Sequence, residues 1–133
     1  MYEIVAAIDD NEQRAKAQAE AIVDMPLDFS DVRVTILHDF TENPSGASVT
    51  QVASVRRANE IFEDAGIDVV LEESSGRPTE AILELADEID ADMIVLAGRK
   101  RTPTGKVLFG SVTQGVILDT DRSVLVCTAK KSE

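Results

Sequence analysis

The chain has 133 residues, of which 44% are hydrophobic and 29% are charged, and its formal net charge is -12 at pH 7. This length suits one compact domain over residues 1–133, and the apolar content excludes a disordered chain. The charge argues against DNA or RNA as the main partner, because nucleic-acid binders neutralise phosphates with basic side chains. An excess of dispersed acids with few lysines is typical of proteins that work in concentrated salt, so we expect a halophilic source.

Five short apolar runs predict buried strands along the whole chain. Most are continuously apolar rather than alternating, as in parallel strands that are covered on both faces. The runs cover residues 3–8, 32–38, 67–72, 92–98 and 123–129. None approaches the ~20 apolar residues of a membrane helix, and no signal peptide is evident, so we expect a cytoplasmic protein without a membrane partner.

Helical spacing of apolar residues predicts helices between these strands, over 11–24, 49–65, 79–90 and 111–118. Asp10 with Gln13 is the expected capping pair of the first helix, Gly66 the stop of the second, and Ser111 the cap of the last. Strands that alternate with helices predict an α/β fold, with an open parallel sheet and helices on both faces.

The segment AGRKRTPTGKVLFGS, which starts at Ala97, is a basic loop in an acidic chain. It carries Arg99, Lys100, Arg101 and Lys106, and no Asp or Glu occurs from Met93 to Leu118. At 98–110 the loop is longer than most strand-to-helix connections. It leaves the carboxyl end of the fourth strand, which is where ligands bind in open parallel sheets.

The loop feeds a helix N-terminus at Gly110, where unpaired N–H groups and the helix dipole attract phosphate. Gly110 would allow a close approach of the backbone, and the hydroxyls of Ser111 and Thr113 would add donors. Arg99, Arg101 and Lys106 would supply positive charge. These features favour a small anionic ligand. The alternative is a surface connection whose basic residues face acidic groups of the same chain or of a dimer mate.

Better-known phosphate motifs do not match. A Walker loop at Gly105 and Lys106 would need glycine in place of Lys100 and a hydroxyl residue in place of Val107. No glycine fingerprint of a dinucleotide-binding fold follows the first strand, and a receiver domain would need a phosphoacceptor that no strand supplies. We find no nucleophile–base set, so catalysis is not expected, although slow hydrolysis of a nucleotide stays open.

The last strand, 123–129, is apolar and is followed only by a short polar tail. An apolar strand at a sheet edge is a liability unless another strand covers it. Pairing with the same strand of a second copy would solve this, so we expect a homodimer through 123–129.

The chain resembles the universal stress protein family. The resemblance rests on the first strand ending in Asp9, on ILH at 36–38, and on GRPTEAILELADEIDADMIVLAGR at 76–99 followed by GSVTQGVI at 110–117 and SVLVC at 123–127. It implies a Rossmann-like three-layer sandwich with strand order 3-2-1-4-5, usually dimeric through the fifth strand. Many members bind ATP, and others do not.

The family's ATP motif, G-x2-G-x9-G-[ST], is matched at Gly98 and at Gly110 with Ser111. Arg101 stands in place of the second glycine, and the loop is one residue shorter than the motif. Asp39 falls where a small apolar residue commonly packs near adenine.

The resemblance implies ATP, alone or with a divalent cation, and a regulatory role in the stress response. Taken together with the basic residues and donors of the loop itself, it gives an expected nucleotide site of Asp9, Gly98, Arg99, Arg101, Gly110, Ser111, Val112 and Thr113. A reshaped site, another anionic ligand, or an interaction protein whose basic loop meets an acidic partner are the alternatives.

Overall fold

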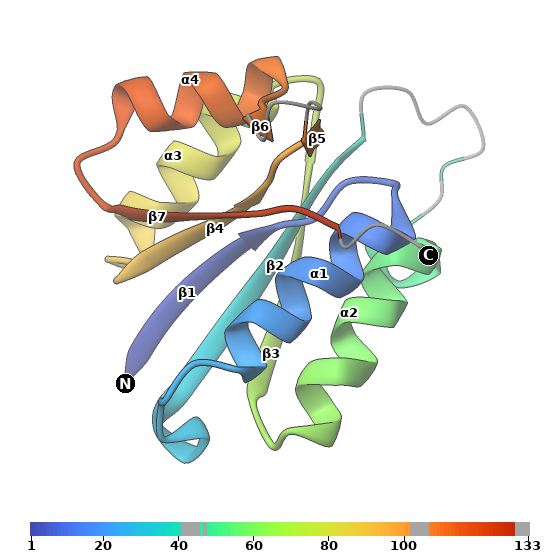
Figure 1. The fold of residues 1–133 in the computed structure, drawn as a ribbon, viewed down its shortest axis with the longest axis vertical. Coiled ribbons are helices and arrows are strands. Elements are labelled where there is room, and N and C mark those ends of the chain that lie inside the picture. The colour runs from blue at the N-terminus through green and yellow to red at the C-terminus, as the bar shows by residue number, and fades with distance from the viewer. Residues whose placement is uncertain (41–45, 47, 102–106, 130–133) are drawn as a thin grey trace.

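The computed structural model describes residues 1–40, 46, 48–101 and 107–129, and it forms an open α/β sandwich (Figure 1). Five parallel strands make the main sheet in the order β3-β2-β1-β4-β7, which confirms the expected fold and strand order. The strands are β1 (Tyr2–Ala7), β2 (Val32–Phe40), β3 (Asp68–Ser75), β4 (Met93–Ala97) and β7 (Ser123–Cys127).

Two pairs of helices cover the two faces of this sheet (Figure 1). On one face lie α1 (Glu12–Val23) and α2 (Ala53–Asp64), and on the other lie α3 (Pro78–Glu88) and α4 (Ser111–Asp119). Two single turns of 3₁₀ helix, η1 (Phe29–Asp31) and η2 (Val49–Gln51), precede β2 and α2. The chain therefore has three layers, with the sheet in the middle.

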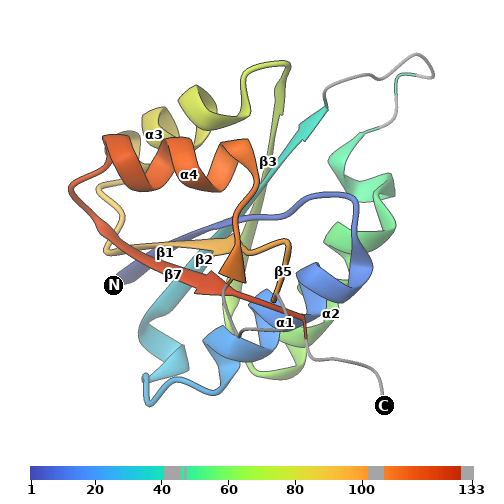
Figure 2. The same cartoon turned by 45° about the horizontal axis from the view of Figure 1, so that its top comes forward.

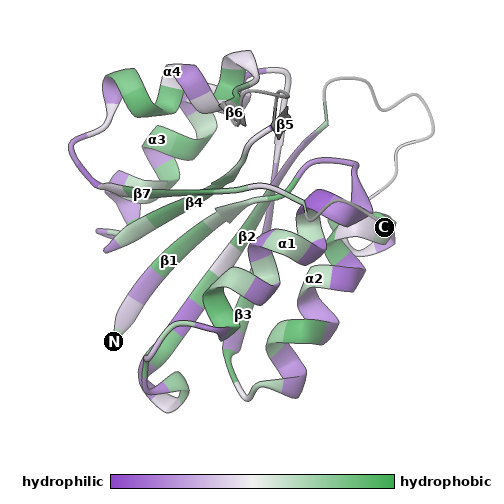
Figure 3. Ribbon diagram, viewed as in Figure 1, coloured by the Kyte–Doolittle hydropathy of each residue, from purple (hydrophilic) through white to green (hydrophobic). Residues whose placement is uncertain are grey.

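The continuous apolar runs arise because the central strands are buried on both faces. In β1, Ile4 and Ala6 pack into the cluster that contains α1 and α2, whereas Val5 packs into the cluster of α3 and α4. The hydropathy colouring shows that β1 and β4 are mainly hydrophobic and that many hydrophilic residues lie on the surrounding helices (Figure 3). Side chains that alternate between two apolar faces leave no polar positions in the pattern.

The helix starts differ from the expected caps. The N-cap of α1 is Asn11, whose side chain accepts a hydrogen bond from the Arg14 amide, so the expectation for Asp10 was wrong. The N-cap of α4 is Gly110, and Ser111 is the first helical residue. The segment expected as one helix over 49–65 divides at Val52, where the extended backbone separates η2 from α2.

The loop after β4 contains a small antiparallel pair that its sequence did not predict. Strand β5 (Lys100–Arg101) pairs with β6 (Val107–Leu108), and Lys100 lies opposite Leu108. Residues 102–106, and with them Lys106, lie outside the described residues. The pair brings the chain back toward the start of α4, because the amide of Arg99 donates to the carbonyl of Leu108 at 2.7 Å.

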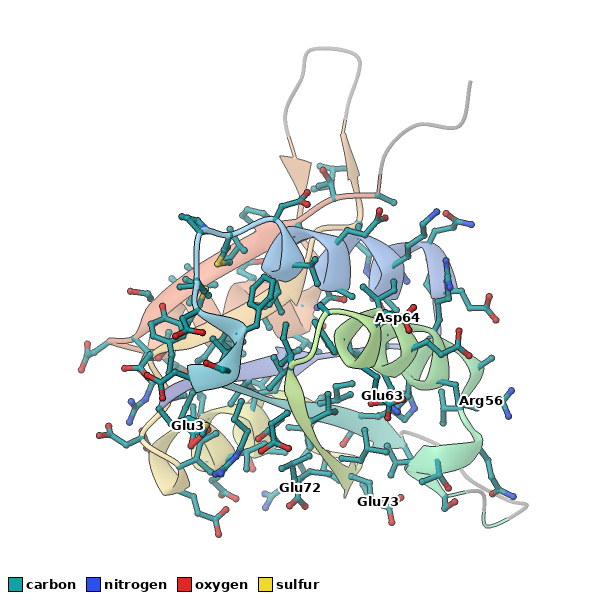
Figure 4. All side chains as sticks on the ribbon, turned by 90° about the horizontal axis from the view of Figure 1, so that it is seen from below. Glu3, Arg56, Glu63, Asp64, Glu72 and Glu73 are labelled. Atoms are coloured by element: carbon teal, nitrogen blue, oxygen red, sulfur yellow. The ribbon has the colours of Figure 1, made fainter. Side chains whose placement is uncertain are left out.

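The two edges of the main sheet differ in charge. Strand β3 exposes Asp68, Glu72 and Glu73, and Figure 4 labels the latter two beside this strand. Strand β7, SVLVC, has no charged residue. Charged side chains on an edge strand discourage pairing with another chain, whereas an uncharged apolar edge does not.

Candidate functional site

A cleft opens where the order of the strands reverses. Strand β1 lies between β2 and β4, so the connections that follow β1 and β4 diverge at their carboxyl ends. Ligands of open parallel sheets bind at such a point. The cleft has a volume of about 210 Å³. It is lined by Ala7, Ile8, Asp9, Asp10, Leu37, His38, Asp39, Pro78, Ile82, Leu96, Ala97, Arg99, Gly110, Val112 and Thr113. Figure 2 turns this end of the sheet toward the viewer.

The N-terminus of α4 faces this cleft with unpaired donors. Gly110 has an extended backbone, and no side chain caps the helix. The first hydrogen bond of the helix runs from the amide of Gln114 to the carbonyl of Gly110 at 3.1 Å. Within the described residues, the amides of Ser111, Val112 and Thr113 have no backbone acceptor. Such amides, together with the helix dipole, favour an anion.

Arg99 places a positive charge over the same helix terminus. A Cβ added to Gly110 would lie 2.8 Å from Nε of Arg99 and 3.2 Å from its Nη2, so the guanidinium lies against Gly110. In the part of the chain that the structure describes, no carboxylate forms an ion pair with Arg99. The backbone at 110 can approach closely because glycine has no side chain there.

Thr113 differs from the expectation that its hydroxyl would bind phosphate. Its Oγ1 donates to the carbonyl of Ala97 at 2.9 Å, and the residue is 6% exposed. A phosphate oxygen accepts hydrogen bonds, so the hydroxyl proton that Ala97 holds is not available to it. The hydroxyl instead ties the first turn of α4 to the end of β4.

Of the other loop residues expected in the site, some line the cleft and some do not. Val112 lines the cleft, whereas Gly98 and Ser111 are not among the residues that line it. Gly98 is buried and its amide donates to the carbonyl of Cys127 at 2.7 Å, which joins β4 to β7. Arg101 is in β5, and its side chain lies outside what the structure describes. The structure therefore brings Asp9, Arg99, Gly110, Val112 and Thr113 together at the cleft.

Asp9 lines the cleft but both of its carboxylate oxygens have partners within the protein. Oδ1 accepts from the amide of Asn11 at 2.9 Å, and Oδ2 accepts from Nε of Arg14 at 2.8 Å. The carbonyl of Asp9 accepts from the hydroxyl of Ser54 in α2. Asp9 thus fixes the turn between β1 and α1, and the contact with a nucleotide that the family resemblance implies for it stays a prediction.

Besides the expected site residues, three polar or charged residues line the cleft: Asp10, His38 and Asp39. Of these three, only Asp39 was expected near the ligand, through the family resemblance. Nδ1 of His38 lies 2.7 Å from the carbonyl of Ile8. A carbonyl only accepts, so this nitrogen carries a proton and Nε2 faces Asp10, whose Oδ1 is 3.4 Å away. The signal for all three residues was their position at the carboxyl ends of β1 and β2.

Asp39 is held in a fixed position at the end of β2. Its Oδ1 accepts from the hydroxyl of Ser74 at 2.7 Å, and Ser74 is the residue opposite it in the β2–β3 register. Both residues are half-buried. The cleft therefore has a cationic side, formed by Arg99 and the start of α4, and a carboxylate side at the ends of β1 and β2.

The described residues include neither a cluster of metal ligands nor a membrane-spanning helix. No group of three or more His, Cys, Asp or Glu among them is arranged to hold a metal ion. Of the helices that the structure describes, none combines the length and apolar character that a membrane span requires.

Several proteins of the universal stress protein family are similar in sequence to part of this chain. A universal stress protein of Methanocaldococcus jannaschii is 31% identical over 93 residues, which are 68% of this chain and 57% of that protein. One from Mycolicibacterium smegmatis is 36% identical over 65 residues, which are 48% of this chain and 50% of that protein. The chain spans about half the length of the curated relatives it matches.

Solved structures match over almost the whole chain. A universal stress protein from Archaeoglobus fulgidus has a TM-score of 0.75 and 28% identity, covering 96% of this chain and 98% of that one. A universal stress protein in complex with cAMP has a TM-score of 0.70 and 26% identity, covering 97% and 98%. The model of the universal stress protein family matches residues 1–128. The chain therefore belongs to the universal stress protein family.

Proposed function

We propose that the chain is a nucleotide-binding regulatory module of the stress response, and that its cleft holds the ligand with the phosphates at the start of α4. ATP is the nucleotide that the family resemblance implies. The observation that carries the proposal is the position of Arg99 over Gly110, beside amides that have no acceptor in the described residues. A relative of this fold was solved in complex with cAMP, which supports a nucleotide as the ligand.

The two sides of the cleft suit the two parts of a nucleotide. Arg99 and the amides of α4 would bind a phosphate group through charge-assisted hydrogen bonds. The base would lie toward β2, where Leu37, Pro78 and Ile82 offer apolar surface. A divalent cation would then enter only with the phosphates of the nucleotide.

The proposal is tested by thermal unfolding with ATP. A ligand that binds the native state and not the unfolded state raises the melting temperature by mass action, so millimolar ATP should raise Tm. The titration should be repeated at several salt concentrations that keep the protein folded, because salt screens phosphate contacts. If neither ATP nor GTP changes Tm at any of these concentrations, the proposal is wrong, and the interaction-protein alternative takes its place.

A second part of the proposal is a homodimer that forms through β7. This edge strand has no charged residue, whereas the opposite edge strand carries acids. Exposed apolar side chains also occur on the segment from β6 through α4, at Leu108, Phe109, Ile117 and Leu118. Pairing two β7 strands would cover backbone groups that the sheet leaves open.

A further inference from the structure

We propose that Gly115 is a positioning residue of the cleft, which sets the affinity for the nucleotide by letting α4 approach α3 closely. The inference rests on the proposed function, because it concerns how the anion-binding start of α4 is held. Of the four α-helices that the structure describes, only α4 has a glycine inside it. Glycine in a helix interior is less favourable than alanine, so its presence there needs a physical reason.

The reason is a close contact between α4 and α3. A Cβ added to Gly115 would lie 3.0 Å from Cγ2 of Thr79 and 3.3 Å from its Oγ1. Non-bonded carbon atoms pack best at about 3.5–4.0 Å, so one of the two groups would have to give way. The two helices lie side by side on one face of the sheet (Figure 1, Figure 2). Gly115 therefore permits a closer spacing of α3 and α4 than a residue with a side chain.

A second contact holds α4 on its other flank. The hydroxyl of Thr113 donates to the carbonyl of Ala97 at 2.9 Å, which ties the first turn of the helix to the end of β4. Residues 113 and 115 lie about 200° apart around a helix, on either side of the buried Val116. The contact with the sheet and the contact with α3 together set the position of the helix start.

Gly115 acts on the ligand through the position of the helix. Neither Gly115 nor Thr79 is among the residues that line the cleft, although Pro78, next to Thr79, and Gly110 are. Gly115 follows Gly110 by five residues, which is roughly 7.5 Å along the helix axis. A shift of α4 at the contact with α3 therefore moves the amides at its start by a similar amount.

A small displacement is enough to change the affinity. Making room for a Cβ at residue 115 requires a movement of a few tenths of an ångström. Charged hydrogen bonds to phosphate are short and directional, and the amides of 111–113 and the guanidinium of Arg99 would act on the same group. Since a misplacement of about 1 Å can cost on the order of 100-fold in function, a shift of this size should cost about 3-fold or more.

The experiment measures the affinity of the full chain for ATP by calorimetric titration, well below the melting temperature. Gly115→Ala should weaken binding by about 3-fold or more. Thr79→Ala removes both atoms that the new Cβ would meet and leaves the Cβ of residue 79 at 3.8 Å, so the double variant should bind ATP as the wild-type chain does. Thr79→Ala alone should also keep the wild-type affinity. Gln114→Ala, at an exposed residue of the same turn, is the control and should keep it too.

A second probe locates the effect within the cleft. Inorganic triphosphate has neither a base nor a ribose, so its binding measures the anion-binding end alone. Its affinity should fall in Gly115→Ala by the same factor as that of ATP. If only the affinity for ATP falls, Gly115 does not position the start of α4, and the inference is wrong. Urea unfolding of the same variants checks that each is folded at the temperature of the titration.

The outcomes separate this inference from the proposed function. If Gly115→Ala binds ATP as tightly as the wild-type chain, or if Thr79→Ala does not restore binding in the double variant, the inference is wrong while nucleotide binding stands. If no nucleotide binds to the wild-type chain, both fall together. Should Gly115→Ala fail to fold, Thr79→Ile crowds the same contact from α3 and should weaken binding to a similar extent. Unchanged binding in that variant would overturn the inference.

Discussion

Nε of Arg14 lies 2.8 Å from Oδ2 of Asp9, and this ion pair joins the end of β1 to the first turn of α1. Asp9 occupies the position that the family resemblance assigns to a nucleotide contact. Its carboxylate also accepts from the Asn11 amide, so it organises the turn that forms one wall of the cleft. Asp9 therefore has a structural role that does not depend on a ligand.

The first prediction concerns this pair. Asp9→Ala removes the acceptor of two hydrogen bonds, one of them charged, and should lower the free energy of unfolding by about 1–2 kcal/mol. Asp10→Ala, at the neighbouring exposed residue, should change it by less than ~0.5 kcal/mol. Urea unfolding without ligand measures both. Equal effects of the two substitutions would show that the Arg14 contact does not stabilise the turn.

The second prediction concerns Gln18, which is fully buried in α1. Its Nε2 donates to the carbonyls of Ala7 at 2.8 Å and Val95 at 3.2 Å, so it bridges β1 and β4 where their ladder ends. Gln18→Met keeps the volume but leaves both carbonyls without this donor, and should cost about 1–3 kcal/mol. Gln13→Met, on the exposed side of the same helix, is the control. If Gln18→Met loses no more stability than the control, the hydrogen bonds of Gln18 to β1 and β4 do not stabilise the fold.

The third prediction concerns Cys127, whose burial raises its pKa from 9.0 to about 11. In the folded protein the thiol stays protonated at pH 8–9, so alkylation by iodoacetamide should be much slower than in urea. Because the pKa is higher in the folded protein, the protonated thiol contributes to the free energy of unfolding. This contribution is complete below pH 9 and is lost as the pH rises toward 11. The wild-type chain should therefore lose more stability over this window than Cys127→Ala. Parallel curves for the two proteins would contradict this.

The fourth prediction concerns the contact of Gly110 with Arg99. In Gly110→Val, the added Cβ would meet Nε of Arg99 at 2.8 Å, and the guanidinium would have to leave its place over α4. The Tm increase that a bound nucleotide gives should disappear, while the Tm of the free protein changes little because the backbone of Gly110 is extended. Arg57→Gln removes a positive charge that is distant in the fold, on α2, and should keep the increase. An unchanged increase in Gly110→Val would place the ligand elsewhere.

The fifth prediction concerns the free edge of β7. The carbonyl of Cys127 accepts from the Gly98 amide in the turn after β4, so the backbone groups of Val126, one residue earlier, point away from β4. Val126→Pro therefore removes only an outward N–H, which an edge strand tolerates. Sedimentation equilibrium should show a dimer for the wild-type chain and for Val126→Thr, and a monomer for Val126→Pro. A wild-type monomer at all concentrations would exclude the dimer.

The sequence was sufficient to predict the fold because its signals agree with one another. The central strands β1 and β4 lie in continuous apolar runs, Gly66 ends α2 with a φ of 79°, and Pro78 starts α3. The expected strand over 67–72 forms as β3, but it is partly exposed rather than buried on both faces. The helix caps were harder, since Asp10, Asn11 and Ser111 are all residue types that cap helices and only the backbone decides between them. The β5–β6 pair was missed because its strands have two residues each.

The candidate site was predicted at its loop and, through the family resemblance, at Asp9, whereas Asp10 and His38 on its other side were not assigned to it. The charge and the glycines of 98–110 pointed to α4, but the pairing of Asp39 with Ser74 depends on the register of β2 and β3, which no local pattern records. The bond from Thr113 to Ala97 also depends on tertiary placement. The single domain over 1–133, the cytoplasmic location and the halophilic source stay predictions.

The acidic residues of β3 discourage the addition of another strand at that edge of the sheet. An incoming strand at that edge would have to bring its own backbone beside Asp68, Glu72 and Glu73, and a second copy would present the same charges again. Of the two edges of the main sheet that the structure describes, β7 is the one without charged residues to discourage pairing. If the proposed dimer forms there, its outer edges are two copies of the acidic β3, which discourage the addition of further strands.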